Sequence, residues 1–569
     1  MEIGLPLHSP EELVTWDWAK LKPYYEELIA SQLTAGNVER WLLNWTKVSE
    51  LADELYNRLA VATTVNTVDK VAEERYKNYM DNFYPKKMEA EQKLKKKLLS
   101  SGLEPDGFAI PLRNMRAEAD IFCKENLPLL IKEEKLNIAL DKILGAQTVE
   151  WEGSEKTVRQ MEVVLRNRER DKRKRGWELT AKRRLQDRDA INENWRKHFA
   201  LRQKIAKNAG KPDYRAYKWQ ELKRFDYTPD DCLAFHKVIE GVVVPAANRL
   251  AERRRKKLGV NTLHYYDLFV DVTNYPPLQP FKDTRELKKK ALAVFNKVNP
   301  RLGTYFGIME REHLLDLANR KNKADGGYCT EFSASKRPFI FANAVGIHDD
   351  VQTLIHEGGH CFHAFEAFKL PYIQQRWTPM EFNEVASMAM ELLASPYLQE
   401  EMGGFYTKRD TARALIGLLE ADIRFWPYMA IVDEFQHWAY MHPADGSDVD
   451  KCDAKWTELE HRFRPYIDWS GYGDVMTTGW QHKHHIHQVP FYYIEYGLAQ
   501  LGAVQVWANA LVDQKKAVEK YLKALALGGT VPLPELYKSA GVKLAFDAQT
   551  LGKAVKLMEE KINELEQMI

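Results

Sequence analysis

His356-Glu357-Gly358-Gly359-His360 is the most informative stretch of this 569-residue chain, because it has the pattern H-E-x-x-H. Histidines four residues apart on an α-helix lie on one face, about one turn apart, and can bind one Zn²⁺ through both imidazoles. The glutamate between them then points to the open side of the metal, where its carboxylate can activate a water molecule. The apolar stripe in residues 350–355 predicts that the motif lies on a helix.

The two glycines inside the motif are unusual for a helix, since each costs about 1 kcal/mol relative to alanine. Gly358 and Gly359 together indicate that another backbone, or a substrate, passes close to this helix. The zinc chemistry itself gives no reason for Gly358.

A third protein ligand must come from elsewhere, because catalytic zinc takes three ligands and keeps one position open. His363 shares the helical face of His356 but lies about 10 Å further along the axis, too far to share the ion. We expect it to support a ligand or to face the substrate. Glu384 is the better candidate. It lies in a helix predicted over residues 380–394, which we expect to begin with a capping box at Thr378.

Two interpretations of Glu384 remain open from periodicity alone. It is either a metal ligand or an ordinary glutamate that stabilises the positive end of its helix. Glu391 lies on the same face, and we predict that it holds a ligating histidine in one tautomer.

The segment Pro338 to Ala344 is the best strand candidate, because it is short, aromatic and partly β-branched. A strand just before the metal helix could align a peptide by antiparallel main-chain hydrogen bonds. We therefore predict substrate contacts at Phe339, Ala342 and Asn343.

A run rich in histidine and tyrosine follows at residues 481–496. Peptide hydrolysis needs donors for the developing oxyanion, and either side chain can serve. One spacing combines His487 with Tyr492 and Tyr496 as catalytic residues, and it is preferred because it is similar to that of the family named below. The alternative combines His484 with Tyr493, both assigned to substrate binding. Ordinary aromatic packing is the competing interpretation for any one tyrosine.

The overall composition is that of a globular protein, with 45% hydrophobic and 29% charged residues and a net charge of +2. This charge gives no bias towards nucleic acid or an anionic membrane. The chain has no apolar run of transmembrane length. Five scattered cysteines favour a reducing compartment, and residues 1–8 do not resemble a signal peptide. We therefore predict a cytoplasmic protein.

Helical patterns dominate the chain, and the most basic of them lies between residues 166 and 207. Acidic residues are interleaved with the arginines and lysines. This mixture favours a solvated helical hairpin with ion pairs between successive turns over a nucleic-acid surface.

From about Thr228 to Gly541 the chain resembles the M3 family of zinc oligopeptidases, and within it the oligoendopeptidase F branch. The matching segments are Gly327-Tyr328-Cys329 with Pro338, Asn343 and Gly346; Asp350 to His363; Glu384-Val385-Ala386-Ser387; and His487 with Pro490 to Tyr496.

This resemblance implies an all-α fold with one small β-sheet beside the zinc helix. An N-terminal helical lobe (residues 1–205) and a catalytic lobe (residues 206–569) would enclose a deep substrate channel. The substrates implied are short, unstructured peptides cut at internal bonds.

The resemblance also implies a ligand set for one zinc ion per chain, with Glu357 as the catalytic base. The ligands would be His356, His360 and Glu384. The glycine that follows Glu357 departs from the bulkier residue expected there.

Two other functions remain open. An exopeptidase or dipeptidase on the same scaffold would need a group that captures a peptide terminus, such as Arg376. A non-catalytic helical protein would use a closed structural zinc, with His363 as a fourth ligand, and would bind nucleic acid through its basic run. The sequence does not decide between a monomer and a dimer.

Overall fold

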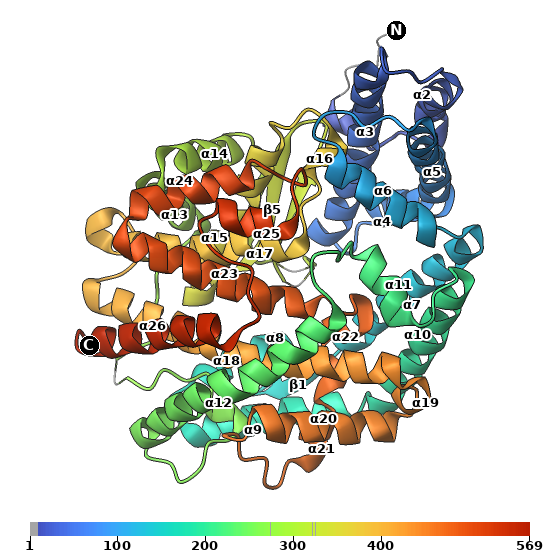
Figure 1. Ribbon diagram of the computed structural model, residues 1–569. Coiled ribbons are helices and arrows are strands. Elements are labelled where there is room, and N and C mark those ends of the chain that lie inside the picture. The colour runs from blue at the N-terminus through green and yellow to red at the C-terminus, as the bar shows by residue number, and fades with distance from the viewer. Residues whose placement is uncertain (1–8, 274, 321, 325) are drawn as a thin grey trace.

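The structure, a computed structural model, describes residues 9–273, 275–320, 322–324 and 326–569. The chain is 71% helical and the described residues contain two small sheets, so the predicted all-α class is confirmed (Figure 1). Every helix in these ranges is too short or too polar to cross a lipid bilayer. Residues 1–8, predicted to carry no signal peptide, lie outside them.

The first helices pack around an apolar core of their own, at the upper right of Figure 1. Leu42, Trp45 and Leu94 are buried at its centre. The elements are α1 (Pro10–Leu13), α2 (Trp18–Ala30), α3 (Val38–Val65), α4 (Lys70–Asn78), the π-helical turn Tyr79–Phe83, α5 (Tyr84–Ser101) and α6 (Ala109–Ile121).

A larger core contains buried residues from Ile121 to Ile562. The two main apolar cores therefore divide between Met115 and Ile121, whereas the predicted lobe boundary at residues 205/206 stays a prediction. The helices from here to the main sheet are α7 (Leu127–Gly145), α8 (Val158–Met161), α9 (Arg170–Leu185), α10 (Arg188–Asn208), α11 (Tyr214–Glu221), α12 (Pro229–Leu258), α13 (Thr284–Val298) and α14 (Pro300–Arg311).

The main sheet has three strands in the order β3-β5-β4. They are β3 (Leu315–Ala318), β4 (Tyr328–Phe332) and β5 (Arg337–Ala344). The predicted strand is thus confirmed as β5, which runs parallel to β3 and antiparallel to β4. Because β5 is central, both of its edges are already paired. Its predicted alignment of a peptide by main-chain hydrogen bonds is therefore wrong, and β4 is the edge strand on that side.

The metal helix follows the sheet directly as α15 (His348–Ala367), packed on β5 and against α17 (Met380–Ala394). Helix α17 has the predicted bounds, and it packs in turn on α23. The remaining helices are α16 (Ile373–Arg376), α18 (Lys408–Met441), α19 (Pro443–Gly446), α20 (Val449–Phe463), α21 (Gly473–Thr477), α22 (His484–Gln488), α23 (Tyr493–Val512), α24 (Gln514–Leu525), α25 (Leu533–Ser539) and α26 (Ala548–Glu566).

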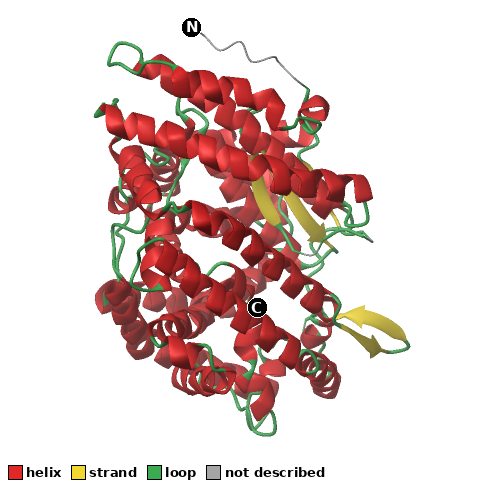
Figure 2. Ribbon diagram, turned by 90° about the vertical axis from the view of Figure 1, so that its right-hand side faces the viewer, coloured by secondary structure: helices red, strands yellow, loops and turns green. Residues whose placement is uncertain are grey.

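A β-hairpin interrupts the region that the sequence predicts to be wholly helical. Strands β1 (Thr148–Trp151) and β2 (Ser154–Thr157) pair antiparallel and project from the body in Figure 2. The turn residues Glu152 and Gly153 both have positive φ, 48° and 78°, as a two-residue hairpin turn requires.

The basic run forms the predicted helical hairpin, built from α9 and α10. Arg173 is buried against Asp267, and Arg202 is buried against Glu133. These arginines are paired within the protein, which supports the interpretation of the run as structural.

Candidate metal centre

His356 and His360 extend from α15 towards Glu384 on α17. The Nε2 atoms of the two histidines lie 3.5 and 3.6 Å from Glu384 Oε2. One potential ligand atom from each of the three residues falls within 4.8 Å of the others. Two imidazole nitrogens and one carboxylate oxygen form the donor set of a catalytic zinc site with one open position. The tertiary structure therefore places the buried Glu384 beside both histidines, in a candidate metal centre.

Helix packing accounts for both glycines of the motif. A Cβ on Gly359 would lie 2.5 Å from the carbonyl oxygen of Ala386 in α17. A Cβ on Gly358 would lie 2.7 Å from Cζ of Phe295, a buried residue of α13. The expectation that another backbone passes close is confirmed for Gly359, whereas Gly358 accommodates a phenylalanine ring.

Glu391 holds His356 as predicted. His356 Nδ1 donates to Glu391 Oε1 at 2.7 Å, which leaves Nε2 facing Glu384. Burial alone would lower the pKa of His356, but the carboxylates of Glu384 and Glu391 raise it well above the usual value. This contact fixes the tautomer that presents Nε2 to a metal.

Glu357 has the environment of a general base. Its side chain is buried beside the candidate metal ligands, and the Cys329 backbone amide donates to it. Burial raises the pKa of Glu357 to about 7, and the nearby carboxylates Glu384 and Glu391 add to the shift. With His356 and Glu391, it lines a largely apolar cavity of about 680 Å³.

Two of the predicted tyrosines lie at this centre. The Tyr492 hydroxyl donates to Glu384 Oε1 at 2.9 Å. The Tyr496 ring lies 5.2 Å from the Tyr492 ring. The presence of both residues agrees with the preferred spacing, but Tyr492 contacts a metal ligand, a role the sequence did not suggest.

His487 is not part of this centre, and its predicted catalytic role is wrong. The side chain is fully buried, between the Trp480 ring at 5.8 Å and the Trp195 ring at 5.5 Å. The prediction rested on a spacing between His487 and the tyrosines that is similar to the spacing in the family. The chain in fact leaves α22 after Gln488 and turns at Phe491, whose φ is 65°.

His485 is the histidine that sequence reasoning missed. Its ring lies 5.9 Å from that of Tyr492 and 5.7 Å from that of Tyr496. Burial lowers the pKa of His485 to about 3, so the imidazole is neutral at pH 7. Among the described residues, its buried Nδ1 has no hydrogen-bond partner. The only sequence signal was its membership of the histidine-rich run.

The alternative pair also differs from expectation. Tyr493 is buried against Phe425 and Tyr428, so its predicted substrate contact is wrong. His484 is exposed, with Nδ1 3.5 Å from Asp141 of α7, and its contact with substrate stays a prediction.

Two of the three predicted substrate residues of β5 face the protein interior. Phe339 and Ala342 are buried. The Asn343 amide donates to the carbonyl oxygens of Ala324 at 2.7 Å and Gly326 at 3.0 Å. The substrate-binding assignment of Phe339 and Ala342 is therefore wrong, because both side chains are buried in packed layers, whereas that of the half-buried Asn343 stays a prediction.

His363 supports helix packing and no metal ligand. It is buried, with Nε2 3.3 Å from the Thr378 hydroxyl and its ring edge-on to Phe382. Its predicted support of a ligand or substrate is wrong. The capping box at Thr378 is wrong for the same reason, since that hydroxyl faces His363 and α17 has Pro379 at its N-cap without a side-chain cap.

Comparison with known proteins gives one family match. The model of peptidase family M3 matches residues 163–555, more than half of the chain. Oligopeptidase PepF of Bacillus subtilis (strain 168) is 24% identical over 341 residues, which cover 57% of this chain and 48% of that protein. An oligoendopeptidase F homolog of Lactococcus lactis subsp. lactis is 24% identical over 343 residues, 57% of this chain and 53% of that protein. The chain thus spans about half the length of these curated relatives.

Solved structures match almost the whole chain. A structure described as PZ peptidase A with inhibitor 2 has a TM-score of 0.91 and 26% identity, and the match covers 97% of this chain and 98% of that one. A putative oligoendopeptidase F has a TM-score of 0.90, with the same identity and coverage.

Proposed function

The chain belongs to peptidase family M3, and on this premise we propose that it is a zinc-dependent endopeptidase that cleaves internal bonds of short, unstructured peptides. One observation carries the proposal: Glu384 completes a two-histidine donor set while Glu357, with a pKa near 7, faces the same cavity. The relatives named oligoendopeptidase F support the same substrate class.

Zinc fits the donor set of His356, His360 and Glu384. When bound, it would supply Lewis-acid polarisation of the scissile carbonyl and of a water molecule. Glu391 keeps the proton of His356 on Nδ1, so that Nε2 offers its lone pair.

Glu357 moves the proton in this proposal. Its carboxylate accepts a proton from the attacking water and then delivers it to the nitrogen of the leaving amine. A pKa near 7 suits both steps, because the group is a competent base before attack and a competent acid after it.

Tyr496 and His485 are the proposed donors to the oxyanion. The Tyr492 hydroxyl already donates to Glu384 Oε1, so we assign Tyr492 the positioning of that ligand. The neutral His485 imidazole and the Tyr496 hydroxyl lie beside it and can each offer one hydrogen bond.

The size of the cavity supports a peptide substrate. At about 680 Å³ it accommodates a few residues in extended form, whereas a folded domain is excluded. We propose that edge strand β4 aligns the peptide, since β5 is paired on both sides.

Arg376, the residue considered for binding a peptide terminus in the alternative exopeptidase, is occupied by contacts within the protein. Arg376 donates through Nη1 to Glu50 at 2.5 Å and through Nη2 to the Leu370 carbonyl oxygen at 2.9 Å. Its guanidinium thus joins the first helices to the rest of the chain and is not free for a substrate carboxylate.

A digest of a mixed peptide library, read by mass spectrometry with and without a chelator, tests the proposal. We expect internal cuts in short peptides that disappear with chelator and return with zinc. Cuts confined to termini would instead support the exopeptidase, and cleavage that persists without metal would contradict both.

A further inference from the structure

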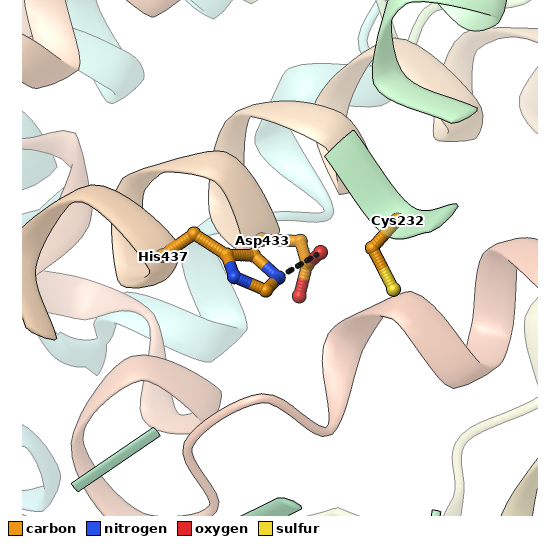
Figure 3. Close-up of side chains that lie close together, drawn as sticks. All are labelled: Cys232, Asp433 and His437. Carbon is orange, nitrogen blue, oxygen red and sulfur yellow. Dashed lines mark ion pairs between the residues drawn. The ribbon is translucent and has the colours of Figure 1, made fainter. Parts of the chain in front are cut away.

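A second cluster of metal-ligating side chains lies outside the proposed active site, between α12 and α18. Helix α12 contributes Cys232 and His236, and α18 contributes Asp433 and His437. Each pair is four residues apart and therefore on one helical face. Figure 3 shows Cys232, Asp433 and His437 directed towards a common point. All four side chains are buried.

The distances within this cluster suit a tetrahedral ion. The potential ligand atoms of Cys232, Asp433 and His437 lie within 4.8 Å of one another. His236 Nε2 and His437 Nε2 lie 3.0 and 3.3 Å from Asp433 Oδ2. Metal–ligand bonds of about 2.0 Å at tetrahedral angles place neighbouring donors about 3.3 Å apart. Cys232, Asp433 and His437 therefore meet the same spacing as the proposed catalytic ligand set, and His236 reaches this group through its contact with Asp433.

Several polar atoms of the cluster are buried without a hydrogen-bond partner among the described residues. They are His437 Nε2, Asp433 Oδ1 and His236 Nδ1. A buried carboxylate oxygen such as Asp433 Oδ1 is costly to leave unpaired, and a shared cation would satisfy it.

We propose that Cys232, His236, Asp433 and His437 bind a structural Zn²⁺ in a closed, four-coordinate site. The donors are one thiolate, one carboxylate and two neutral imidazoles, a mixed set that zinc accepts. The charges of the ion, thiolate and carboxylate sum to zero, which lowers the cost of burial. Burial raises the pKa of the Cys232 thiol, so binding must release the thiol proton to solvent as the sulfur–zinc bond forms.

Two neighbouring side chains, Glu434 and Arg215, contact the histidines of the proposed site. With Nε2 on the metal, the Nδ1–H of His236 faces Glu434 Oε2 at 3.6 Å, a typical outer partner of a zinc-bound histidine. Arg215 Nη1 lies 3.3 Å from His437 Nδ1, which carries a proton when Nε2 binds zinc. Binding of zinc would therefore require Arg215 Nη1 to move away from His437 Nδ1.

The site lies directly under the turn that leads to Tyr492. The His437 ring packs 5.2 Å from the Phe491 ring. The neighbouring Gln436 accepts the Phe491 backbone N–H at 2.8 Å. A metal ion between α12 and α18 would therefore stabilise the segment that presents the tyrosines to the catalytic centre.

Cobalt replacement tests the proposal on the intact protein. A thiolate bound to Co²⁺ gives a near-ultraviolet charge-transfer band, whereas the proposed catalytic ligand set contains no thiolate. After removal of bound metal and saturation with Co²⁺, we expect two equivalents per chain and this band. One equivalent with no charge-transfer band in the wild-type protein would overturn the proposal, whether or not any variant folds.

Three variants test whether the charge-transfer band comes from Cys232. Cys232→Ser should lose it and bind one equivalent of Co²⁺, whereas Cys361→Ser, a thiol next to His360, should keep the band and both equivalents. His360→Ala should keep the band while binding one equivalent, so this site is measured independently of peptidase activity. A band that survives Cys232→Ser but disappears in Cys361→Ser would overturn the assignment.

Discussion

Gly359 of α15 lies against the backbone of Ala386 in α17, so closely that a Cβ on the glycine would be 2.5 Å from the Ala386 carbonyl oxygen. That oxygen also accepts a hydrogen bond from Tyr521 at 2.7 Å, which restricts its movement. The close approach brings Glu384 within reach of both histidines. The close packing of α15 on α17 thus also sets the proposed ligand geometry.

Replacing Gly359 with alanine should therefore destabilise the protein. The contact is with backbone, so the helices must separate, at a cost of about 1–3 kcal/mol and with weaker zinc binding. Gly241→Ala is the matched control, since that helical glycine of α12 has open space at its Cβ and should gain up to about 1 kcal/mol. Thermal unfolding and zinc titration measure both effects. Equal stability of the two variants would contradict this role of Gly359.

Replacing Glu357 with glutamine should separate catalysis from metal binding. The amide keeps the shape of the side chain but cannot accept a proton, so we expect kcat to fall by about 10²–10⁴-fold. Zinc content should match that of the wild type, because Glu357 is not a ligand in the proposed set. Steady-state kinetics together with metal analysis check this, and near-native turnover would rule out Glu357 as the base.

Tyr492 and Tyr496 should respond differently to loss of the hydroxyl. Tyr492→Phe removes the hydrogen bond to Glu384, so we expect zinc affinity to fall by about 10–100-fold. Tyr496→Phe should lower kcat by about 10²–10³-fold while zinc affinity is preserved. Zinc titration and kinetics at saturating zinc distinguish the two roles. The assignment fails if both variants show the same pattern.

His485 and His487 provide a direct test of the corrected assignment. His485→Ala should reduce kcat, because a neutral donor beside the tyrosines is lost. His487→Phe should leave kcat close to that of the wild type, because His487 packs between tryptophan rings away from the metal. Kinetic constants for both variants decide the point, and the opposite ranking would restore His487.

Glu118 should make stability depend on pH in the acidic range. Its carboxylate lies 2.5 Å from both Lys95 and Lys223, which connects the two apolar cores. Burial alone would raise the pKa of Glu118, but Lys223 and Lys95 lower it to about 2, from 4.5. The stabilisation is therefore complete above pH 4.5 and is lost as the pH falls towards 2. It amounts to at most about 3 kcal/mol.

Thermal unfolding of Glu118→Gln across this pH range measures the effect. The difference in Tm from the wild type should be largest at pH 7 and should vanish near pH 2. Glu104→Gln is the control, since the Glu104–Arg116 pair is exposed at 3.6 Å and should contribute little at any pH. A difference that does not change with pH would contradict the role of the ionised carboxylate.

The sequence by itself determined what depends on periodicity within one element. His356 and His360 share a face of one helix, so this pair could be predicted from spacing alone. Spacing also placed Glu384 and Glu391 on one face of another helix, but only the family resemblance made Glu384 a ligand. The bounds of α17 and the existence of β5 followed from local composition in the same way.

Only the tertiary structure decided what depends on how separate elements meet. Because the chain turns at Phe491, His485 and not His487 lies beside the tyrosines. Because β5 is the central strand, it has no free edge to pair with a substrate. Gly358 leaves room for Phe295 of α13. Cys232 lies close to Asp433 although about 200 residues separate them in the sequence. Spacing along a chain carries no information across a turn or between helices, because the relative placement of elements is set by packing of the whole core.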